Sequence, residues 1–594
     1  MLEATPECGL IPGARHTQTP LPMSTPSAPI PPLSPASAKL LYDGYQFQLR
    51  GMYEDAARLY RKILKIAPDN PDVVHLLAMV RARQARAEEA IELYKSALAR
   101  KSNDGKIWYN YALAVGGLQR SEEASDAMER ALTLDPNIAE GPQYLSSFRR
   151  DTCDWRHFDA LMDAARRTAL MPNATAAPFF SLWFDEPELH AEVGRRAMAK
   201  KAAGVTPIYR HDPATRRPGP IRLAYLSSDF RGHPVAHLIT QLLEEHDRSQ
   251  FEVTAISSGP DDGGELRKRI ISAVDRFEDC QNDLGPQVAA RIKALDIDIL
   301  VDLSGHTAGA RIEALAQRPA PIQVNYLGYA ATTAAPFMDY IIADEVVLPF
   351  SEERFYSEQI VHLPDTYLPC DASLPVAETP TRAACGLPET GLVFCAFNTV
   401  HKFDPHMFAL WMRLLKATPG SVLWLRVGNE RARTQTLPQA AIDNGVDPAR
   451  LVFAPLVQMD EHLARLRNAD LFLDTFPYNA HTTAADALRS GLPVVTQAGR
   501  SFVSRVAASL LMQAGLEDLV TTSAEEYEAL ALSLATDPER LAEVRARLAQ
   551  ALPTMPLLDA PRYRRHIESA YTLMMERWTQ GLPPVPFAVS PLPR

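Results

Sequence analysis

Residues 221–234 read IRLAYLSSDFRGHP, and this stretch decides the fold. Six mostly apolar residues, 221–226, predict a buried strand. The polar run that follows ends at Pro234, and proline is favoured as the first residue of a helix. A buried strand that leads through a short loop into a helix is the building unit of a parallel sheet. We therefore predict a parallel strand over 221–226 and a helix over 235–245.

The same alternation of strand and helix continues through most of the remaining chain. Short apolar runs bounded by turns predict buried parallel strands. Two series of such runs predict two Rossmann-like domains, over 216–385 and 386–575, with a hinge near 379–391. Ligands of these folds bind beyond the carboxyl ends of the strands. The expected strands are 221–226, 251–256, 297–302, 322–326 and 340–343 in the first series, and 392–397, 421–426, 451–453, 471–474 and 493–496 in the second.

Small residues recur at intervals of 34 positions before the first strand. One set is Gly44, Ala78 and Ala112, and the other is Ala56, Ala90 and Ala124. Small side chains at fixed positions let paired antiparallel helices approach closely, and the pattern resembles the tetratricopeptide repeat. It predicts an α-helical solenoid over 37–150, followed by a helical cap and connector over 151–215; a helical bundle with a coincidental period is the alternative. Such solenoids present a surface to other proteins, so we expect protein partners.

Composition and charge restrict the kind of partner. The 594 residues are 46% hydrophobic and 22% charged, as in ordinary folded proteins. A net charge of −11 argues against nucleic acid. No apolar run reaches the ~18 residues of a membrane helix and no signal pattern opens the chain, so we expect a cytoplasmic protein without membrane contact. The six cysteines lack paired spacing, and the proline-rich tails, 1–36 and 576–594, are expected to be disordered.

Two histidines follow strands of the first series. His233 ends the loop after 221–226, and His306 lies in the loop after 297–302. A neutral imidazole at a strand end could relay a proton from an attacking hydroxyl. Alternatively, His233 caps the helix that follows it, and His306 makes a hydrogen bond within its turn. His237 lies one helical turn after His233 but has no third ligand nearby, so a zinc site is not expected.

A lysine follows the first strand of the second series. Lys402 precedes Asp404 and Pro405, which suit the N-cap and the first residue of a helix over 406–417. A lysine beside a helix N-terminus could neutralise a diphosphate. A solvated surface lysine is the alternative.

Two further loops of the second series carry candidate binding residues. The run His481-Thr482-Thr483 precedes a helix, where backbone N–H groups could reach phosphate oxygens; an ordinary N-cap explains Thr482 equally well. Asp486, one turn later, could accept hydrogen bonds from ribose hydroxyls. His462 and Arg465 share a helix face after strand 451–453. His462 could stack on a base, and an Arg–Glu surface pair is the alternative.

Several common nucleotide motifs are absent. The sequence has no Walker A loop and no G-x-G-x-x-G after the first strand of either series, which disfavours a kinase, an ATPase and a nicotinamide enzyme. The run Asp296-Ile297-Asp298 opens a strand and does not end one. We therefore expect no metal, and expect Lys402 and helix dipoles to meet the charge of a diphosphate.

Four ordered motifs resemble the O-linked N-acetylglucosamine transferase family. They are SSDFxxHP over 227–234, RPAPIQ over 318–323 with LGY over 327–329, FNxxxK over 397–402 and HTT over 481–483. With the repeats, the resemblance covers most of residues 40–540. It implies a GT-B fold of two Rossmann-like domains. It also implies inverting transfer of N-acetylglucosamine from UDP-N-acetylglucosamine to Ser or Thr hydroxyls of protein acceptors, without metal or cofactor.

The resemblance also implies roles for individual residues. His233 matches the histidine near the reacting centre, with His306 in the same half, and Lys402 matches the lysine on the diphosphate. His462 matches the histidine that stacks on uracil. The remaining residues expected at the nucleotide are Arg465 near the base, Asn398 of the FNxxxK motif, His481, Thr482 and Thr483 in the phosphate-binding turn, and Asp486 at the ribose.

Some positions depart from the animal enzymes of this family. Thr399, His401 and Met459 replace a glutamine, a tyrosine and a lysine, and 328–332 lacks a Pro-Gly pair. These positions border the nucleotide and sugar, so another donor stays open: GDP-fucose, as in the related SPINDLY-type O-fucosyltransferases, or UDP-glucose. A repeat scaffold with a non-catalytic nucleotide-binding half is the alternative from another class. The identity of the acceptor, the general base and a homodimer also stay open.

Overall fold

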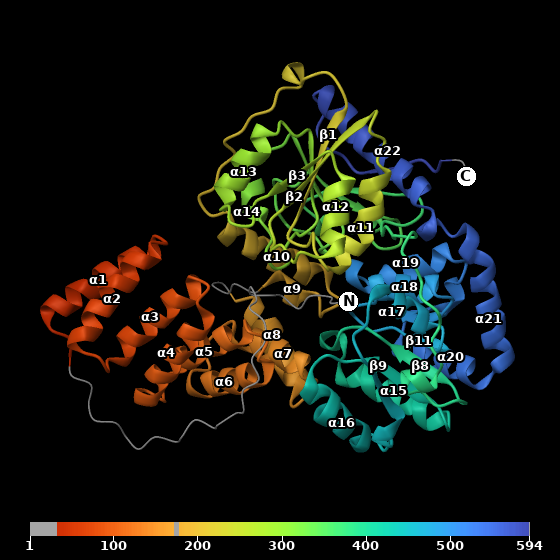
Figure 1. Cartoon of the computed structure of the whole chain (residues 1–594), viewed down its shortest axis with the longest axis horizontal. Coiled ribbons are helices and arrows are strands. Elements are labelled where there is room, and N and C mark those ends of the chain that lie inside the picture. Colours follow the sequence, from red (N-terminus) through yellow and green to blue (C-terminus); the bar gives the residue numbers. More distant parts are fainter. Residues whose placement is uncertain (1–31, 172–176, 593–594) are drawn as a thin grey trace. The chain divides into compact units, whose positions relative to one another are not determined.

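A computed structural model describes residues 32–171 and 177–592, and the chain separates into two units (Figure 1). We call residues 7–174 the helical unit and residues 175–594 the sheet unit. The expected tail over 1–31 lies outside the described residues. No helix in the described ranges is both long and apolar enough to cross a bilayer.

The helical unit consists of antiparallel helix pairs whose small residues are buried between them. Ala56, Ala90 and Ala124 have no exposed surface. A Cβ atom added at Gly44 would lie 2.7 Å from the ring of Tyr60, so this position needs glycine. The predicted repeats are present, as α1 (Pro35–Leu49), α2 (Tyr53–Ile66), α3 (Pro71–Arg83), α4 (Ala87–Arg100), α5 (Gly105–Gly116) and α6 (Ser121–Leu134), followed by α7 (Gly141–Asp151) and α8 (Phe158–Ala169).

The expected domain boundaries in this region need correction. α1 begins at Pro35 after its N-cap Ser34, two residues before the expected start at 37. The segment 151–215, expected to form one connector, is divided between the two units. α8 packs on α7 in the helical unit. α9 (Pro178–Ser181) and α10 (Pro187–Lys201) belong to the sheet unit, where Met198 enters the core beneath the first sheet.

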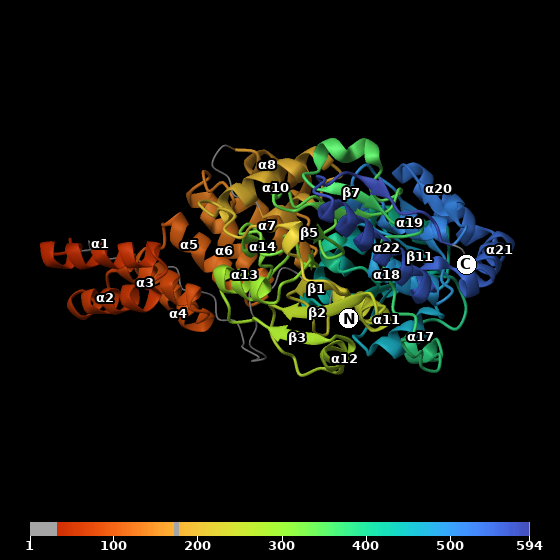
Figure 2. The ribbon, with the colours of Figure 1, turned by 90° about the horizontal axis from the view of Figure 1, so that it is seen from above.

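The sheet unit contains two all-parallel sheets (Figures 1 and 2). In the first, the strand order is β14-β7-β6-β5-β4-β1-β2-β3, and in the second it is β10-β9-β8-β11-β12-β13. In both sheets the order reverses beside the first strand, between β1 and β4 and between β8 and β11. These are the topological switch points at which doubly wound folds bind ligands. We call the two halves the first and second sheet domains.

The ten predicted strands are all present, with ends within two residues of those expected. The structure adds β3, β7, β13 and β14, of two to four residues each. The strands are β1 (Ile221–Ser227), β2 (Phe251–Ser257), β3 (Arg276–Asp279), β4 (Ile299–Asp302), β5 (Ile322–Asn325), β6 (Tyr340–Ala343), β7 (Gln359–His362), β8 (Val393–Ala396), β9 (Val422–Arg426), β10 (Leu451–Ala454), β11 (Leu471–Leu473), β12 (Val494–Gln497), β13 (Val520–Thr521) and β14 (Phe587–Ala588).

Helices connect these strands and cover the sheets. In the first sheet domain they are α11 (Pro234–Glu245), α12 (Glu265–Ala273), α13 (Gly285–Ala294) and α14 (Ile312–Leu315). In the second they are α15 (Pro405–Ala417), α16 (Leu437–Asp443), α17 (Met459–Leu466), α18 (Thr482–Arg489), α19 (Val506–Gln513), α20 (Ala524–Thr536) and α21 (Pro538–Ala551). The last helix, α22 (Ala560–Thr579), returns to the first domain and packs against α11.

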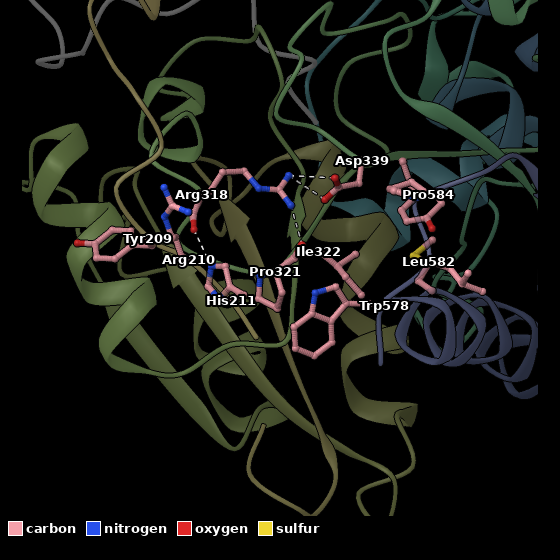
Figure 3. Close-up of a pocket in the computed structure, with 12 residues that line it drawn as sticks. Tyr209, Arg210, His211, Arg318, Pro321, Ile322, Asp339, Trp578, Leu582 and Pro584 are labelled. Atoms are coloured by element: carbon pink, nitrogen blue, oxygen red, sulfur yellow. Dashed lines mark hydrogen bonds and ion pairs between the residues drawn. The ribbon is translucent and has the colours of Figure 1, made fainter. Parts of the chain in front are cut away.

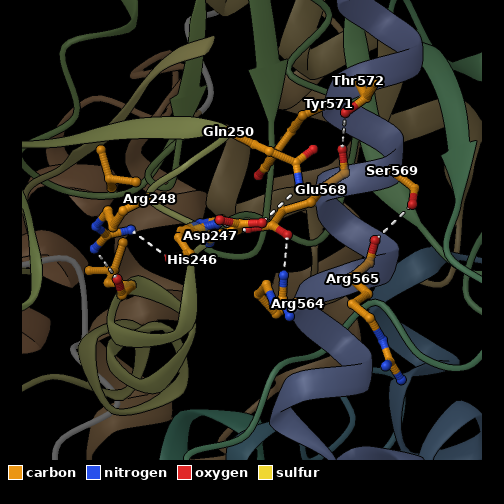
Figure 4. A network of polar contacts seen from close by, with 12 residues as sticks. His246, Asp247, Arg248, Gln250, Arg564, Arg565, Glu568, Ser569, Tyr571 and Thr572 are labelled. Carbon is orange, nitrogen blue, oxygen red and sulfur yellow. Dashed lines mark hydrogen bonds and ion pairs between the residues drawn. The ribbon is translucent and has the colours of Figure 1, made fainter. Parts of the chain in front are cut away.

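The expectation of a disordered C-terminal tail is wrong through residue 592. β14 pairs with the edge strand β7, and the Val589 N–H donates to the His362 carbonyl at 2.9 Å. Ahead of it, Glu568 of α22 accepts hydrogen bonds from His246 Nδ1 and from the Asp247 N–H, each at 2.9 Å (Figure 4). The chain after 560 is therefore part of the first sheet domain, which moves the expected boundary at 575.

Candidate active site

Most of the expected site residues follow strands at the two switch points, whereas His462 and Arg465 lie on α17, after β10. His233 and His306 follow β1 and β4 in the first sheet domain. Lys402 follows β8, and the β11–α18 loop (residues 474–481) leads into Thr482. Parallel strands present their carboxyl ends at one edge of a sheet, so each pair of loops forms one face of its domain.

Lys402 is buried, so the surface-lysine alternative is wrong. Only 3% of the residue is exposed. Its ammonium donates to the Asn479 carbonyl at 2.9 Å and lies 4.1 Å from the ring centre of Tyr478. The predicted start of the helix is confirmed, because Asp404 caps α15 by accepting from the Met407 N–H at 2.8 Å. The ammonium is thus held against the loop that leads into α18.

The N-terminus of α18 lies in the same loop. Thr482 is the first helical residue and does not serve as N-cap; the N-cap His481 makes no side-chain capping bond. The Thr483 hydroxyl donates to Asn398 Oδ1 at 2.6 Å, which joins α18 to the residue that follows β8. The positive end of a helix dipole next to the Lys402 ammonium attracts a phosphate group.

Asp474 organises this loop, and the sequence reasoning missed it. Its carboxylate accepts from the Thr475 N–H at 2.7 Å, the Ala480 N–H at 2.6 Å and the Thr496 hydroxyl at 2.6 Å. Asn398 Nδ2 donates to it at 3.3 Å. Burial raises the pKa of Asp474 to about 6. The sequence did offer a signal for this residue, because Asp474 directly follows the buried strand β11, beside the switch point.

His462 and Arg465 form a buried pair on α17, so the surface-pair alternative is wrong. Arg465 Nη2 donates to His462 Nδ1 at 3.2 Å, and its guanidinium lies 4.9 Å from the ring centre of Phe397. Because arginine only donates, the proton of the neutral imidazole is on Nε2. That nitrogen lies 3.6 Å from Asp486 Oδ2. Burial lowers the pKa of His462, which keeps the ring neutral.

His233 is the N-cap of α11, as one of the two sequence interpretations predicts. Its Nδ1 accepts from the Val235 N–H at 3.2 Å, and the Asp229 carboxylate lies 3.8 Å from the same nitrogen. With Nδ1 accepting, the neutral ring carries its proton on Nε2. This geometry suits a hydrogen-bond donor to substrate better than a base that accepts a proton at Nε2.

His306 makes its contacts with distant segments, and not within its own turn as the alternative interpretation expected. The ring is buried, and Nε2 donates to the Thr333 carbonyl at 2.8 Å. Nδ1 lies 3.5 Å from the Lys201 ammonium, which can only donate to it. Burial lowers the pKa of His306 to about 3. Both ring nitrogens of His306 therefore have partners within the protein.

The loops of the two sheet domains approach each other at α11 and α18. Burial lowers the pKa of His237 on α11, and the Asp486 carboxylate on α18 opposes that shift. Such an influence requires the two side chains to be neighbours. The structure therefore brings His237 of the first domain near Asp486 of the second.

A cavity of about 390 Å³ lies at the other end of the first sheet (Figure 3). It is bounded by the amino ends of β5 and β6 and by α22, and contains none of the expected site residues. Arg318 on its wall donates to both Asp339 carboxylate oxygens at 3.0 Å and to the Pro321 carbonyl at 2.7 Å. Arg318 of the RPAPIQ motif thus joins the amino ends of β5 and β6. In the same way, Asp298, just before β4, pairs with Arg222 at the amino end of β1.

Comparison with known proteins identifies the family. The model described as glycosyl transferase family 41 matches residues 197–377 and 372–567, and a tetratricopeptide repeat model matches 105–138. The chain belongs to glycosyl transferase family 41. A solved mutant O-GlcNAc transferase from Thermobaculum terrenum is 28% identical, with a TM-score of 0.66, over 92% of this chain and 98% of that one.

Curated members of the family from plants and animals are also similar. The probable UDP-N-acetylglucosamine–peptide N-acetylglucosaminyltransferase SEC of Arabidopsis thaliana is 36% identical over 62% of this chain and 38% of its own length. The Caenorhabditis elegans UDP-N-acetylglucosamine–peptide N-acetylglucosaminyltransferase is 29% identical over 69% of this chain and 44% of its own. The chain thus spans about two fifths of the length of these relatives.

Proposed function

We propose that this member of family 41 is an inverting, metal-independent protein O-glycosyltransferase. It transfers N-acetylglucosamine from UDP-N-acetylglucosamine to Ser or Thr hydroxyls of protein acceptors. The observation that carries the proposal is the buried Lys402 ammonium, placed beside the N-terminus of α18 at the switch point of the second sheet. The names of the relatives support the donor and the acceptor class.

Lys402 and α18 would stabilise the leaving group. When an acceptor oxygen attacks the anomeric carbon, the bond from that carbon to the β-phosphate breaks and negative charge grows on the diphosphate. An ammonium and a helix N-terminus fixed beside that charge act without reorganising, and removing one such group typically costs ~10²–10³ in kcat. These groups supply the positive charge that a divalent ion supplies in metal-dependent transferases.

The nucleoside end of the donor would lie on α17 and α18. The His462 ring packs 5.7 Å from Phe397 between ring centres, and Arg465 fixes its tautomer. Asp486 Oδ2 is buried and faces the His462 Nε2–H at 3.6 Å, which is longer than a normal hydrogen bond. A buried carboxylate oxygen with such a long contact is suited to accept from ribose hydroxyls. His233, with its proton on Nε2, would donate to the donor or acceptor from the first sheet domain.

The helical unit would supply the contact with protein acceptors. Its paired helices form the expected repeats, and such arrays present extended surfaces to protein partners.

Thermal unfolding with UDP or GDP in the presence of EDTA tests the proposal. A ligand at 100 times its dissociation constant adds ~2.7 kcal/mol of stability, which shifts the melting temperature measurably. We expect stabilisation by UDP alone, lost in Lys402→Met. Stabilisation by GDP alone would point to a GDP-sugar donor. Stabilisation by neither nucleotide would favour a repeat scaffold with no donor site.

A further inference from the structure

The segment between α9 and α10 connects the first sheet domain to the second. α10 is rooted in the first domain, because Met198 lies in its core and a Cβ atom added at Gly194 would lie 3.1 Å from the Ala334 side chain. The turn before α10 carries Asp185, whose side chain accepts hydrogen bonds from the loop that follows β12, residues 499–504. One side chain thus reaches from a first-domain element to a second-domain loop.

The Asp185 carboxylate holds that loop by several hydrogen bonds. Oδ1 accepts from the Ser501 N–H and the Ser501 hydroxyl, each at 2.8 Å, and from the Ser504 hydroxyl at 2.7 Å. Oδ2 accepts from the Arg500 N–H at 2.7 Å. Burial opposes ionisation, but the hydrogen bonds from Ser504, Arg500 and Ser501 keep the pKa of Asp185 below its usual value. The carboxylate also fills the space beside Gly499, where a side chain would collide with it.

The 499–504 loop in turn holds the residues around Lys402. The Val503 carbonyl accepts from the Asn479 N–H at 3.2 Å and from His481 Nε2 at 3.3 Å. The Asn479 carbonyl accepts from the Lys402 ammonium at 2.9 Å. Asp185 is therefore connected to Lys402 through the loop and Asn479.

A second contact joins α9, the helix before this segment, to the same cluster. Phe179 of α9 lies 6.0 Å from Tyr478 and 6.2 Å from His401 between ring centres. Tyr478 is the ring over which the Lys402 ammonium lies. The hydrogen bonds of Asp185 and the ring contacts of Phe179 thus both lead to the Lys402 ammonium.

We infer that Asp185 is a positioning residue for the diphosphate of the donor. Its carboxylate fixes the 499–504 loop, and through that loop it sets the places of Asn479, His481 and Lys402. The inference rests on the proposed function, because it assigns the diphosphate to this loop. It implies that the segment between α9 and α10 completes the donor site although it precedes both sheets in the chain.

Calorimetric titration of Asp185→Asn with UDP and with uridine tests the inference in the full-length protein. The amide keeps the size of the side chain but loses the charge and one acceptor oxygen. Because hydrogen bonds to a charged acceptor are strong, we expect UDP to bind about tenfold more weakly. Uridine affinity should not change, because the contacts described for His462, Arg465 and Asp486 are with one another and with residues outside 499–504. An equal loss for both ligands, or no loss for UDP, would overturn the positioning role.

Glu188→Gln is the matched control. Glu188 Oε1 pairs with Arg500 Nη2 at 2.6 Å in the same two segments, but both side chains are about half exposed. Exposed pairs contribute little, so we expect UDP affinity to stay at the wild-type level.

Amide hydrogen exchange separates this inference from the proposed function. Without any nucleotide, the peptide 475–483 should exchange faster in Asp185→Asn than in the wild type, because the Asn479 N–H loses its fixed acceptor. Unchanged exchange in that peptide would overturn the connection even if UDP binds. Failure of the wild type to bind UDP or GDP would instead overturn the proposed function, and the exchange result would still decide whether Asp185 positions Asn479.

Discussion

Lys402 is the residue whose replacement should separate catalysis from folding. Methionine has a similar length and suits a buried position, whereas alanine would leave a cavity where 97% of the lysine is covered. We expect Lys402→Met to lower kcat by about 10²–10³ while the protein still unfolds cooperatively, because the leaving group loses its cation. Lys416→Met, at the exposed end of α15, is the control. Equal kcat values for Lys402→Met and the wild type would contradict the assignment.

Asp474 should make stability fall between pH 4 and 6. The folded state holds the proton of this carboxyl up to a pKa of about 6, whereas the ordinary value is 3.8. The folded state therefore binds more protons than the unfolded state in this window, and stability decreases as pH rises through it. Asp474→Asn lacks this titration, so the wild type should lose about 2 kcal/mol relative to the variant from pH 4 to 6. Thermal unfolding of both proteins across this pH range measures the difference between their stabilities. A difference that does not change with pH would contradict the raised pKa.

The residues of the site could be predicted from the sequence more readily than their environments. Lys402, His462 and Asp486 were found because each follows a strand end or lies on the helix after it. Their burial could not be predicted, because Lys402 is covered by Tyr478 and Asn479, more than seventy positions away. His233 and His306 look alike in sequence, and they differ only because Lys201 and Thr333, from distant elements, use both nitrogens of His306.

At the scale of elements, α22 should stabilise the first sheet domain through Glu568. This buried carboxylate accepts from His246 Nδ1 and the Asp247 N–H (Figure 4). Glu568→Ala leaves both donors unsatisfied, which should lower the free energy of unfolding by about 3 kcal/mol. Chemical unfolding measures the loss, with Glu576→Ala on the exposed face of the same helix as control. Losses of equal size in the two variants would show that the Glu568 contacts do not anchor α22.

The elements themselves followed largely from the sequence pattern. Buried central strands such as β1 and β4 are mostly apolar runs, so their type and place were predictable. The four residues of β3 are all partly or fully exposed, and β14 has two residues after a run of prolines, so neither gives a periodic signal. β14 forms because β7 offers an edge for pairing, which is a property of the assembled sheet.

At the scale of the whole molecule, the two units should have separable roles. Deleting residues 1–174 removes the helical unit and leaves both switch points intact. We expect hydrolysis of the sugar nucleotide to persist while transfer to protein acceptors falls, since the repeats would no longer bind the acceptor. Rates of free sugar release and of protein labelling measure the two activities. Undiminished protein labelling would show that the sheet unit selects its acceptors alone.

NMR observation of UDP-N-acetylglucosamine with a protein acceptor in EDTA tests the central claim most directly. The donor carries an α-linked sugar, so an inverting enzyme produces a β-linked sugar on Ser or Thr together with free UDP. We predict both products in the wild type and neither in Lys402→Met. An α-linked product, or turnover that requires an added divalent ion, would contradict the account.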